Sequence, residues 1–503
     1  MPILPNQIPV TVLEEISPDT KRTAEMYTRL GYTVSEALAD LADNSIDAKA
    51  KKILIRFIRT PDKISRVLIV DDGSGMDDAT LKEAMRFGSE QEKDGLQLGK
   101  YGIGLKTASL SQAKTVTVLS RKDGSYCGRR WTIDNMKRGW LCATLDNAGI
   151  KQFLEQEFLP LEIKQSGTVV SWDDLEHFQS MPTTIESIIK NTIHNISIDL
   201  GIRFHRFIKD GRIQIFVDAQ SAGATPTTIY NKIIPLDPFS YPEPGKDGYP
   251  KKFSIELNPH RTITLESHIW PPKSKQLGYT LGGGKVSSRQ GFYFYRNDRL
   301  IQAGGWNGYR DDNNEPHLSL ARVKIDMPHN MDADFQLDIK KSHVEPPSDF
   351  VTKVSAATQG RHSFKDFIQD ALAIYGKQKT IDSAKFPHIP GRGFPAKAAA
   401  EVRGILHEHG AEKPGAVNFS WKKLVPRKLF ELDRDRHTIF LNKFYRKDIL
   451  QSEKASLADA PLVKLLLFFL LQDEINRKVS TKKYLDWEKR INDALVTAIG
   501  YRD

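Results

Sequence analysis

Hydrophobic residues recur along the first third of the chain with two different periods. In residues 36–48, EALADLADNSIDA, the inward-facing positions lie three or four residues apart, which predicts a helix with one buried face. Residues 53–58 and 66–73 are instead short apolar runs rich in β-branched side chains, which predict two strands. Similar runs at residues 115–120 and 166–172 predict two more strands.

Four polar residues share the other face of the 36–48 helix, because they too are three or four residues apart: Asp40, Asp43, Asn44 and Asp47. Acids this close repel one another unless a positive charge lies among them. A hydrated divalent cation between this face and a polyphosphate would supply that charge, since Mg²⁺ prefers a few protein oxygens together with phosphates. A solvated acidic helix face is the alternative, and the helix alone slightly favours it.

A turn with two glycines, residues 71–76, DDGSGM, follows the second predicted strand. The glycines let the backbone approach a flat ligand closely. The carboxylate at the strand end, Asp71, can accept a hydrogen bond from an amino group. An ordinary turn has the same pattern, so both a binding site and a plain turn stay open.

Residues 99–109, GKYGIGLKTAS, form a second glycine-rich segment. Its glycines free backbone N–H groups for phosphate oxygens, and the helix predicted to start there adds its positive end. The segment differs from a Walker A loop, because Lys106 comes one residue late and no strand directly precedes it. The polar residues 87–99 have the composition of a mobile lid.

A second pattern covers about residues 176–350. Its predicted elements are a helix, a strand, a loop rich in Pro and Gly, and two strands around a tight turn, at residues 186–204, 212–219, 235–252 and 291–301. The arginines beside the tight turn, Arg296 and Arg299, are expected to serve the hairpin and its surface rather than catalysis.

The last region, residues 351–503, predicts three helices, at residues 351–380, 461–479 and 482–500, with a Pro/Gly linker at residues 386–395. The helix at 461–479 is apolar all round, so we expect it to be buried on nearly all sides. Basic pairs alternate with aromatic residues in this region: Lys422 and Lys423, Arg427 and Lys428, Arg446 and Lys447, with Trp421, Phe430 and Tyr445. Such mixing suits a nucleic-acid surface, and a solvated face beside a core is the alternative.

Composition places the chain among soluble globular proteins, with 39% hydrophobic and 27% charged residues in 503. The net charge of +10 lies entirely in residues 351–503, which hold 28 Lys and Arg against 18 Asp and Glu and invite a polyanion. Cys127 and Cys142 offer neither a disulfide framework nor a zinc site, and no signal peptide is visible. The longest apolar run, residues 465–471, is too short to span a bilayer. Together these features predict a cytoplasmic protein with no membrane partner.

Four motifs in order carry a family resemblance: E-x3-D-x2-D-N-S-x-D-A, D-x-G-x-G-M, G-x2-G-x-G-L-K-[ST] and a late G-T strand. Over about residues 20–175 they resemble the GHKL superfamily of ATPases with its Bergerat nucleotide fold, and the third motif is most similar to MORC-type members. The resemblance implies an α+β protein. Its parts would be a Bergerat-fold α/β sandwich ATPase domain at residues 1–175, a transducer-like α/β domain at 176–350 and a basic, mainly helical C-terminal domain at 351–503.

The resemblance also implies residue roles. Asn44 would be the Mg²⁺ ligand and Asp71 the acceptor of the adenine amino group. Asp40 stands where the superfamily usually has a Glu as general base, and its stem is shorter by roughly 1.5 Å, which predicts slow hydrolysis. Glu36, a turn earlier, points too far back to substitute.

The remaining nucleotide-binding residues that the resemblance implies are Asp47, Ala48, Gly73, Gly75, Met76, Gly99, Lys100, Tyr101, Gly102, Ile103, Gly104, Leu105, Lys106, Thr107 and Thr168. In the related families a transducer lysine reaches the γ-phosphate and reports its presence. Lys341 is our preferred residue for that role and its neighbour Lys340 the second choice, while a solvated lysine pair explains both equally well.

The resemblance therefore implies a Mg²⁺-dependent ATPase that forms a homodimer on binding ATP and acts as a conformational clamp. The basic C-terminal region favours DNA as the clamped molecule, and the MORC likeness suggests DNA silencing or anti-phage defence, with other subunits encoded nearby as further partners. A nucleotide-dependent protein chaperone or scaffold is the alternative. A histidine kinase is disfavoured, because the 35 residues before the motif helix contain no His.

Overall fold

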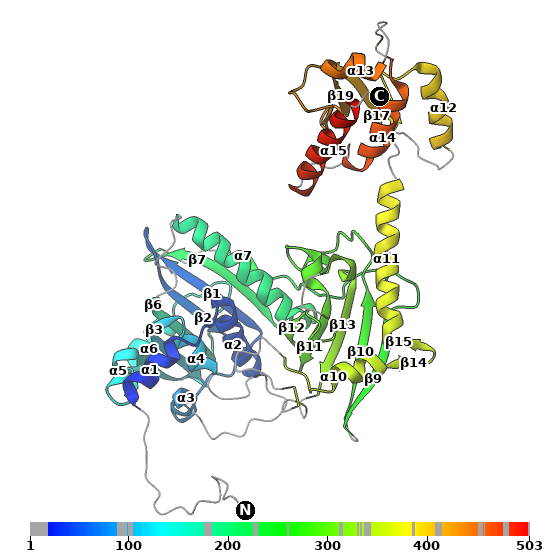
Figure 1. Cartoon of the computed structure of the whole chain (residues 1–503). Helices are drawn as coiled ribbons and strands as arrows, with labels where there is room; N and C mark the ends of the chain where they lie inside the picture. Colours follow the sequence, from blue (N-terminus) through cyan, green and yellow to red (C-terminus); the bar gives the residue numbers. More distant parts are fainter. Residues whose placement is uncertain are drawn as a thin grey trace, which may run out of the picture. The chain divides into compact units, whose positions relative to one another are not determined.

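The computed structural model describes residues 19–87, 98, 104–175, 184–224, 230–258, 261–310, 315–328, 331, 334–335, 344–384, 388–407, 415–450, 456, 458–475 and 482–500. The chain divides into two compact units, Met1–Tyr375 and Gly376–Asp503. Figure 1 shows both units with most of their longer elements labelled. Among the helices in these ranges, none combines the length and the apolar character needed to cross a bilayer.

An eight-stranded sheet forms the centre of the first part of the larger unit, with the order β5-β4-β3-β6-β2-β1-β7-β8. Its strands are β1 (Lys52–Arg59), β2 (Ile64–Asp71), β3 (Ala113–Lys122), β4 (Ser125–Thr132), β5 (Ala143–Thr144), β6 (Gly167–Leu175), β7 (Gln214–Ser221) and β8 (Asn231–Lys232). All neighbours are antiparallel except β1 and β7, which pair in parallel. The strands expected in this part of the sequence are present, and the sheet extends past residue 175.

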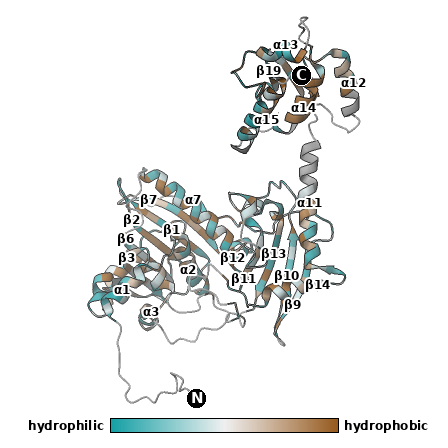
Figure 2. Ribbon diagram, viewed as in Figure 1, coloured by the Kyte–Doolittle hydropathy of each residue, from teal (hydrophilic) through white to brown (hydrophobic). Residues whose placement is uncertain are grey.

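The two faces of this sheet are buried by different helices, because side chains alternate along each strand. Ile53, Ile55 and Phe57 of β1 join one core, and Leu54 joins the other. The first core is closed by α1 (Thr20–Thr28), α2 (Val34–Asp47), α4 (Gly104–Leu110) and α7 (Ile185–Arg203), and the second by α6 (Asn147–Leu154). Figure 2 shows hydrophobic residues, in brown, along the strands between these layers. Short helices α3 (Asp78–Met85), α5 (Ile133–Lys137) and α8 (His205–Lys209) complete this part.

The turn after β2 depends on a glycine at residue 75. Gly75 has φ +64°, and a Cβ there would lie 1.9 Å from the carbonyl oxygen of Arg121. We expect Gly75→Ala to lower the free energy of unfolding by about 3 kcal/mol, measured by urea denaturation. Gly124→Ala is the matched control, since Gly124 has φ +83° but no atom within 4 Å of the new Cβ. It should cost only about 1–2 kcal/mol, and equal losses in the two variants would contradict the close approach at Gly75.

A five-stranded sheet, β12-β11-β13-β10-β9, forms the second part of the same unit. Its strands are β9 (Lys251–Asn258), β10 (Arg261–Ile269), β11 (Gly291–Arg296), β12 (Arg299–Ala303) and β13 (Ala321–Met327). The predicted hairpin is β11–β12, and its turn residues Asn297 and Asp298 have φ of 47° and 66°, as a two-residue type I′ turn requires.

Two helices pack against this second sheet, α10 (Phe350–Ala356) and α11 (Phe364–Ala384), and a short β14–β15 ladder (Thr358–Gln359, His362–Ser363) separates them. The stretch expected to be helical over residues 351–380 is therefore interrupted. The remaining short elements are α9 (Leu277–Thr280), η2 (Val286–Arg289) and η3 (Pro316–Leu318).

The C-terminal unit combines helices with a small sheet. Its helices are α12 (Ala396–His407), η5 (Lys443–Tyr445), α13 (Arg446–Leu450), α14 (Pro461–Ile475) and α15 (Lys482–Gly500). A four-stranded sheet that we did not predict contains β16 (Ile389–Pro390), β17 (Ala416–Lys422), β18 (Phe430–Asp433) and β19 (Thr438–Asn442). The expectation that the helix at 461–479 is buried on nearly all sides is wrong, because Leu462 and Leu466 of α14 are 69% and 60% exposed.

Candidate nucleotide-binding site

The start of α2 is fixed by a reciprocal cap. The Thr33 hydroxyl accepts a hydrogen bond from the Glu36 amide at 3.2 Å, and a Glu36 carboxylate oxygen accepts one from the Thr33 amide at 2.9 Å. Such a capping box satisfies two backbone donors that the first turn leaves without partners. Glu36 therefore serves the helix start, and the next turns of α2 carry the polar residues of the site.

The acids of α2 lie in separate environments. Asp40 is 2% exposed and accepts a hydrogen bond from the Tyr32 hydroxyl at 3.2 Å. Asp43 accepts one from Arg299 Nε at 2.7 Å, while Asp47 accepts one from the Leu98 amide at 2.8 Å. The acidic face is therefore not solvated, and part of its charge is balanced by a guanidinium.

This guanidinium belongs to Arg299, for which we expected a different role from the sequence. Arg299 is only 1% exposed, so the expectation that it serves the surface of the β11–β12 hairpin is wrong. Besides binding Asp43, its Nη2 lies 3.9 Å from Oδ1 of Asp40. Arg296 beside it is also buried.

Asn44, on the next position of α2, has a buried side-chain nitrogen with no hydrogen-bond partner in the described part of the chain. Leaving this buried N–H donor unsatisfied costs about 1–3 kcal/mol, which a hydrogen-bond acceptor such as a phosphate oxygen would remove, while the carboxamide oxygen is the atom that could bind a metal. Among the described residues no group of three or more His, Cys, Asp or Glu could hold a metal ion by itself. An Asn44-bound Mg²⁺ would thus need oxygens from a phosphate ligand, as Mg²⁺ sites with few protein ligands do.

The carboxylate of Asp71 lies at the end of β2, beside α2. It accepts hydrogen bonds from the Ser45 hydroxyl at 3.1 Å and the Gly73 amide at 2.9 Å, and the strand register places Thr168 of β6 opposite it. Burial raises the pKa of Asp71 to about 6, against the lowering effect of hydrogen bonds from Gly73, Ser45 and the Thr168 backbone. A buried carboxylate held by fixed donors is a specific acceptor for an amino group.

The turn after Asp71 is tied to the sheet by hydroxyl groups. The Met76 amide donates to the Ser120 hydroxyl at 2.8 Å, and Ser120 lies 3.2 Å from the Thr168 hydroxyl. At the other side of the turn a Cβ on Gly73 would lie 2.9 Å from Cβ of Ala48, so this pair brings the turn directly against the end of α2. Ser45 and Ser120 were not predicted, because single serines carry no spacing signal.

The described end of the glycine-rich segment forms α4, which contains Gly104, Leu105, Lys106 and Thr107. A Cβ on Gly104 would lie 3.4 Å from a carboxylate oxygen of Asp40, so α4 begins beside the expected base. Lys106 is 2% exposed and donates to the carbonyls of Ala84 and Arg86 at the end of α3. In this structure its ammonium therefore ties α4 to α3. Seven of the predicted site residues lie outside the described residues: Gly99, Lys100, Tyr101, Gly102, Ile103, Lys340 and Lys341.

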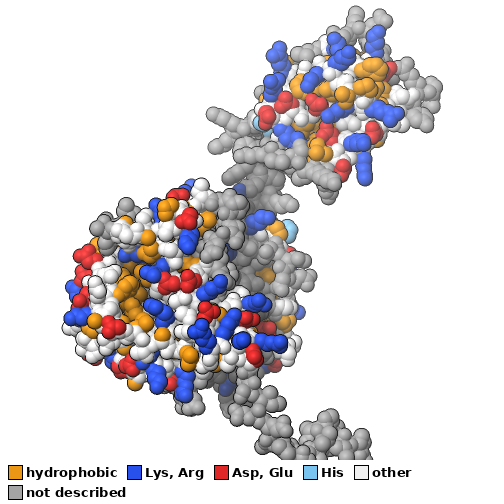
Figure 3. Space-filling view, turned by 90° about the vertical axis from the view of Figure 1, so that its left-hand side faces the viewer, with side chains coloured by type: hydrophobic (Ala, Val, Ile, Leu, Met, Phe, Trp, Pro, Cys, Tyr) orange, Lys and Arg blue, Asp and Glu red, His pale blue; other side chains and the backbone are white. Residues whose placement is uncertain are grey.

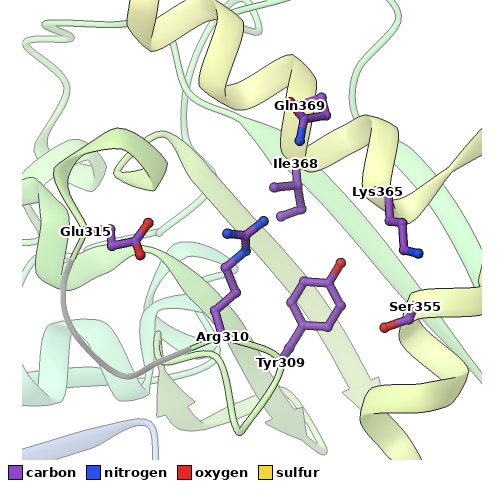
Figure 4. A pocket seen from close by; sticks show the side chains of 7 residues that line it. All are labelled: Tyr309, Arg310, Glu315, Ser355, Lys365, Ile368 and Gln369. Atoms are coloured by element: carbon purple, nitrogen blue, oxygen red, sulfur yellow. The ribbon is translucent and has the colours of Figure 1, made fainter.

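A separate pocket of about 460 Å³ lies in the second part of the unit, between α10, α11 and the loop after β12. Figure 4 shows its lining side chains: Tyr309, Arg310, Glu315, Ser355, Lys365, Ile368 and Gln369. None of the predicted site residues belongs to this set, so the pocket is distinct from the α2–β2 site.

The α2 helix, the β2 turn, α4 and the start of β6 thus meet at one side of a mixed sheet, with Asn44 and Asp71 on neighbouring elements. The family described as histidine kinase-, DNA gyrase B- and HSP90-like ATPase matches residues 32–168, which contain α2, the β2 turn, α4 and the first two residues of β6. Residues 32–168 are therefore a GHKL-type ATPase domain, as the motifs predicted.

Among curated proteins the similarity is to MORC-type ATPases. Protein MICRORCHIDIA 6 of Arabidopsis thaliana is 29% identical over 148 residues, which are 29% of this chain and 22% of that protein. The human ATPase MORC2 is 34% identical over 91 residues, 17% of this chain and 9% of its own length. ATPase morc-1 of Caenorhabditis elegans is 32% identical over 88 residues, 18% and 10% of the two chains. Each of these matches spans less than a quarter of the relative.

Proposed function

We propose that the chain binds ATP with Mg²⁺, hydrolyses it slowly and uses the nucleotide to gate a homodimeric clamp on DNA. The observation that carries the nucleotide part is the pair of buried polar groups, Asp71 and Asn44, on two elements of a GHKL-type domain. Asp71 accepts the adenine amino group, and Asn44 offers an oxygen to Mg²⁺. When bound, Mg²⁺ would neutralise charge on the phosphate oxygens.

Hydrolysis needs a base near the γ-phosphate, and Asp40 is the residue proposed for it. Asp40 takes a proton from water, the water oxygen bonds to the γ-phosphorus, and the bond from that phosphorus to the β–γ bridging oxygen breaks. The Tyr32 hydroxyl, 3.2 Å from the Asp40 carboxylate, holds its direction. A base must come within hydrogen-bond reach of its water, so the shorter aspartate stem favours slow turnover.

Nucleotide affinity should depend on the ionisation of Asp71. Its pKa is raised to about 6, so the carboxylate that accepts the amino group is present above pH 6 and is lost as the pH falls. We expect ATP to bind about tenfold more weakly at pH 5 than at pH 7.5, measured by calorimetry. Inosine triphosphate is the control. Its phosphates titrate like those of ATP, but its base has a carbonyl oxygen where adenine has the amino group. Its affinity should not fall, and parallel losses for both nucleotides would contradict the role of Asp71.

The DNA part of the proposal is supported by the C-terminal unit. Figure 3 shows Lys and Arg side chains spread over its visible face, with hydrophobic side chains between them. Lys422, Lys428 and Arg446 form ion pairs with acids of the same unit, so they are less available to a polyanion. Phe444, between basic residues, is 77% exposed, which suits stacking on a base.

A protein chaperone or scaffold with the same nucleotide switch is the second candidate, and the MORC likeness favours DNA over it. One assay separates them: ATP turnover and sedimentation of the chain, with and without DNA, over a series of salt concentrations. The clamp on DNA predicts faster turnover with DNA and binding that weakens steeply with salt. ATP-dependent dimerisation without any DNA effect would favour the chaperone.

Lys341 stays the proposed γ-phosphate sensor. We expect Lys341→Ala to lose ATP-dependent dimerisation, which sedimentation measures.

A further inference from the structure

We propose that Arg299 is a positioning residue for Asp40, so that the second part of the unit sets the charge and direction of the catalytic carboxylate. This inference rests on the proposed ATPase function and goes beyond it. Arg299 belongs to β12, and Asp40 and Asp43 belong to α2 of the GHKL-type domain. The pair Arg299–Asp43 therefore joins residues 256 positions apart in the sequence.

The guanidinium of Arg299 lies close to two different carboxylates, those of Asp43 and Asp40. Its Nε donates to Oδ1 of Asp43 at 2.7 Å, a hydrogen bond that fixes the guanidinium on α2. Its Nη2 is 3.9 Å from Oδ1 of Asp40, close enough to act on its charge but beyond hydrogen-bond length. All three side chains are at most 2% exposed, so solvent screens these interactions little. The hydrogen bond to Asp43 thus holds the guanidinium of Arg299 in place, and its positive charge acts electrostatically on the carboxylate of Asp40.

The hairpin that carries Arg299 is itself anchored to the helices after β6. Its turn residue Asp298 accepts from Arg206 at 3.1 Å and from Arg212 at 2.9 Å. The Arg206 guanidinium also lies 3.7 Å from the ring centre of Tyr295 in β11, and β12 contacts α7. Figure 1 shows β11 and β12 beside the end of α7. Any shift of the hairpin relative to α2 therefore changes the distance from Arg299 to Asp40.

The charged and titratable groups around Asp40 include Tyr32, Asp43 and Arg299, with Arg203 acting on Asp43 and Glu36. A nearby cation favours the ionised form of a carboxylate, and a nearby anion disfavours it. Removing Arg299 should therefore make Asp40 harder to ionise, and removing the charge of Asp43 should make it easier. A merely structural arginine would produce neither shift.

The experiment compares pH–turnover profiles of the full chain with Arg299→Gln and Asp43→Asn. We expect Arg299→Gln to keep its ATP affinity within about twofold, lose about tenfold in kcat at pH 7, and move the acidic limb of its profile to higher pH. Asp43→Asn should move that limb to lower pH. The double variant Arg299→Gln with Asp43→Asn removes both buried charges, so it serves if the single arginine variant does not fold, and it should also lose turnover.

Arg56→Gln is the matched control, because Arg56 is equally buried and paired with Asp218 at 2.7 Å but contacts no acid of α2. It is expected to lower stability while keeping the parental pH profile. If folded Arg299→Gln keeps that profile, or if the double variant keeps the parental turnover, the positioning role is overturned. If the parent chain itself does not bind ATP in calorimetry, the proposed function fails instead, and the two failures are distinguishable.

Discussion

Asp40→Asn is expected to bind ATP with parental affinity and to hydrolyse it about 100- to 10,000-fold more slowly. Asparagine has the same shape and can still accept from the Tyr32 hydroxyl, but it cannot take the proton of the attacking water. The site keeps its guanidinium, because Arg299 remains hydrogen-bonded to Asp43. Single-turnover release of phosphate measures the rate, and calorimetry with a non-hydrolysable analogue measures binding.

Asp173→Asn is the control for this substitution. Asp173 is partly exposed and pairs with Arg66 on the sheet, away from α2, so its loss should leave turnover unchanged. An Asp40→Asn protein that hydrolyses ATP at the parental rate would assign the base to another residue.

Asn44→Ala is expected to lower the affinity for ATP in the presence of Mg²⁺ by about 100-fold, the size of a loss of about 3 kcal/mol. The reason is that the Asn44 carboxamide is the proposed Mg²⁺ ligand on α2, and its buried side-chain nitrogen has no hydrogen-bond partner among the described residues. Calorimetry in Mg²⁺ measures the loss.

The metal itself provides the control for Asn44. With EDTA in place of Mg²⁺, the parent and Asn44→Ala should bind ATP with similar, weak affinity, because the metal contribution is absent from both. Equal affinities in Mg²⁺ would remove Asn44 from the metal site.

Much of the site was predictable because its residues lie within local motifs. The helical spacing of α2 and the strand before Asp71 place Asn44 and Asp71 on neighbouring elements, and the Ser45–Asp71 hydrogen bond joins them. The strands of the first sheet were predictable from their apolar runs. The parallel pairing of β7 with β1 was not, because no local pattern tells which edge a later strand joins.

Arg299 could not be found in the same way. An arginine after a tight turn is an ordinary hairpin residue, and its partners lie more than 250 positions earlier, so no spacing connects them. In the C-terminal unit, β17 and β18 were missed because basic and aromatic residues in them suggested a surface. The apolar composition of α14 predicted burial, yet its face with Leu462 and Leu466 is exposed.

The parallel strand β7 limits where the chain can be truncated without damaging the first sheet. A fragment ending at residue 175 would lack β7, and with it Asp218, the carboxylate that neutralises the buried Arg56. It would also make β1 an exposed edge strand, whose unpaired backbone N–H and C=O groups could pair with another chain. A fragment made to study nucleotide binding should therefore extend to the end of β8. Shorter fragments are expected to aggregate for reasons unrelated to catalysis.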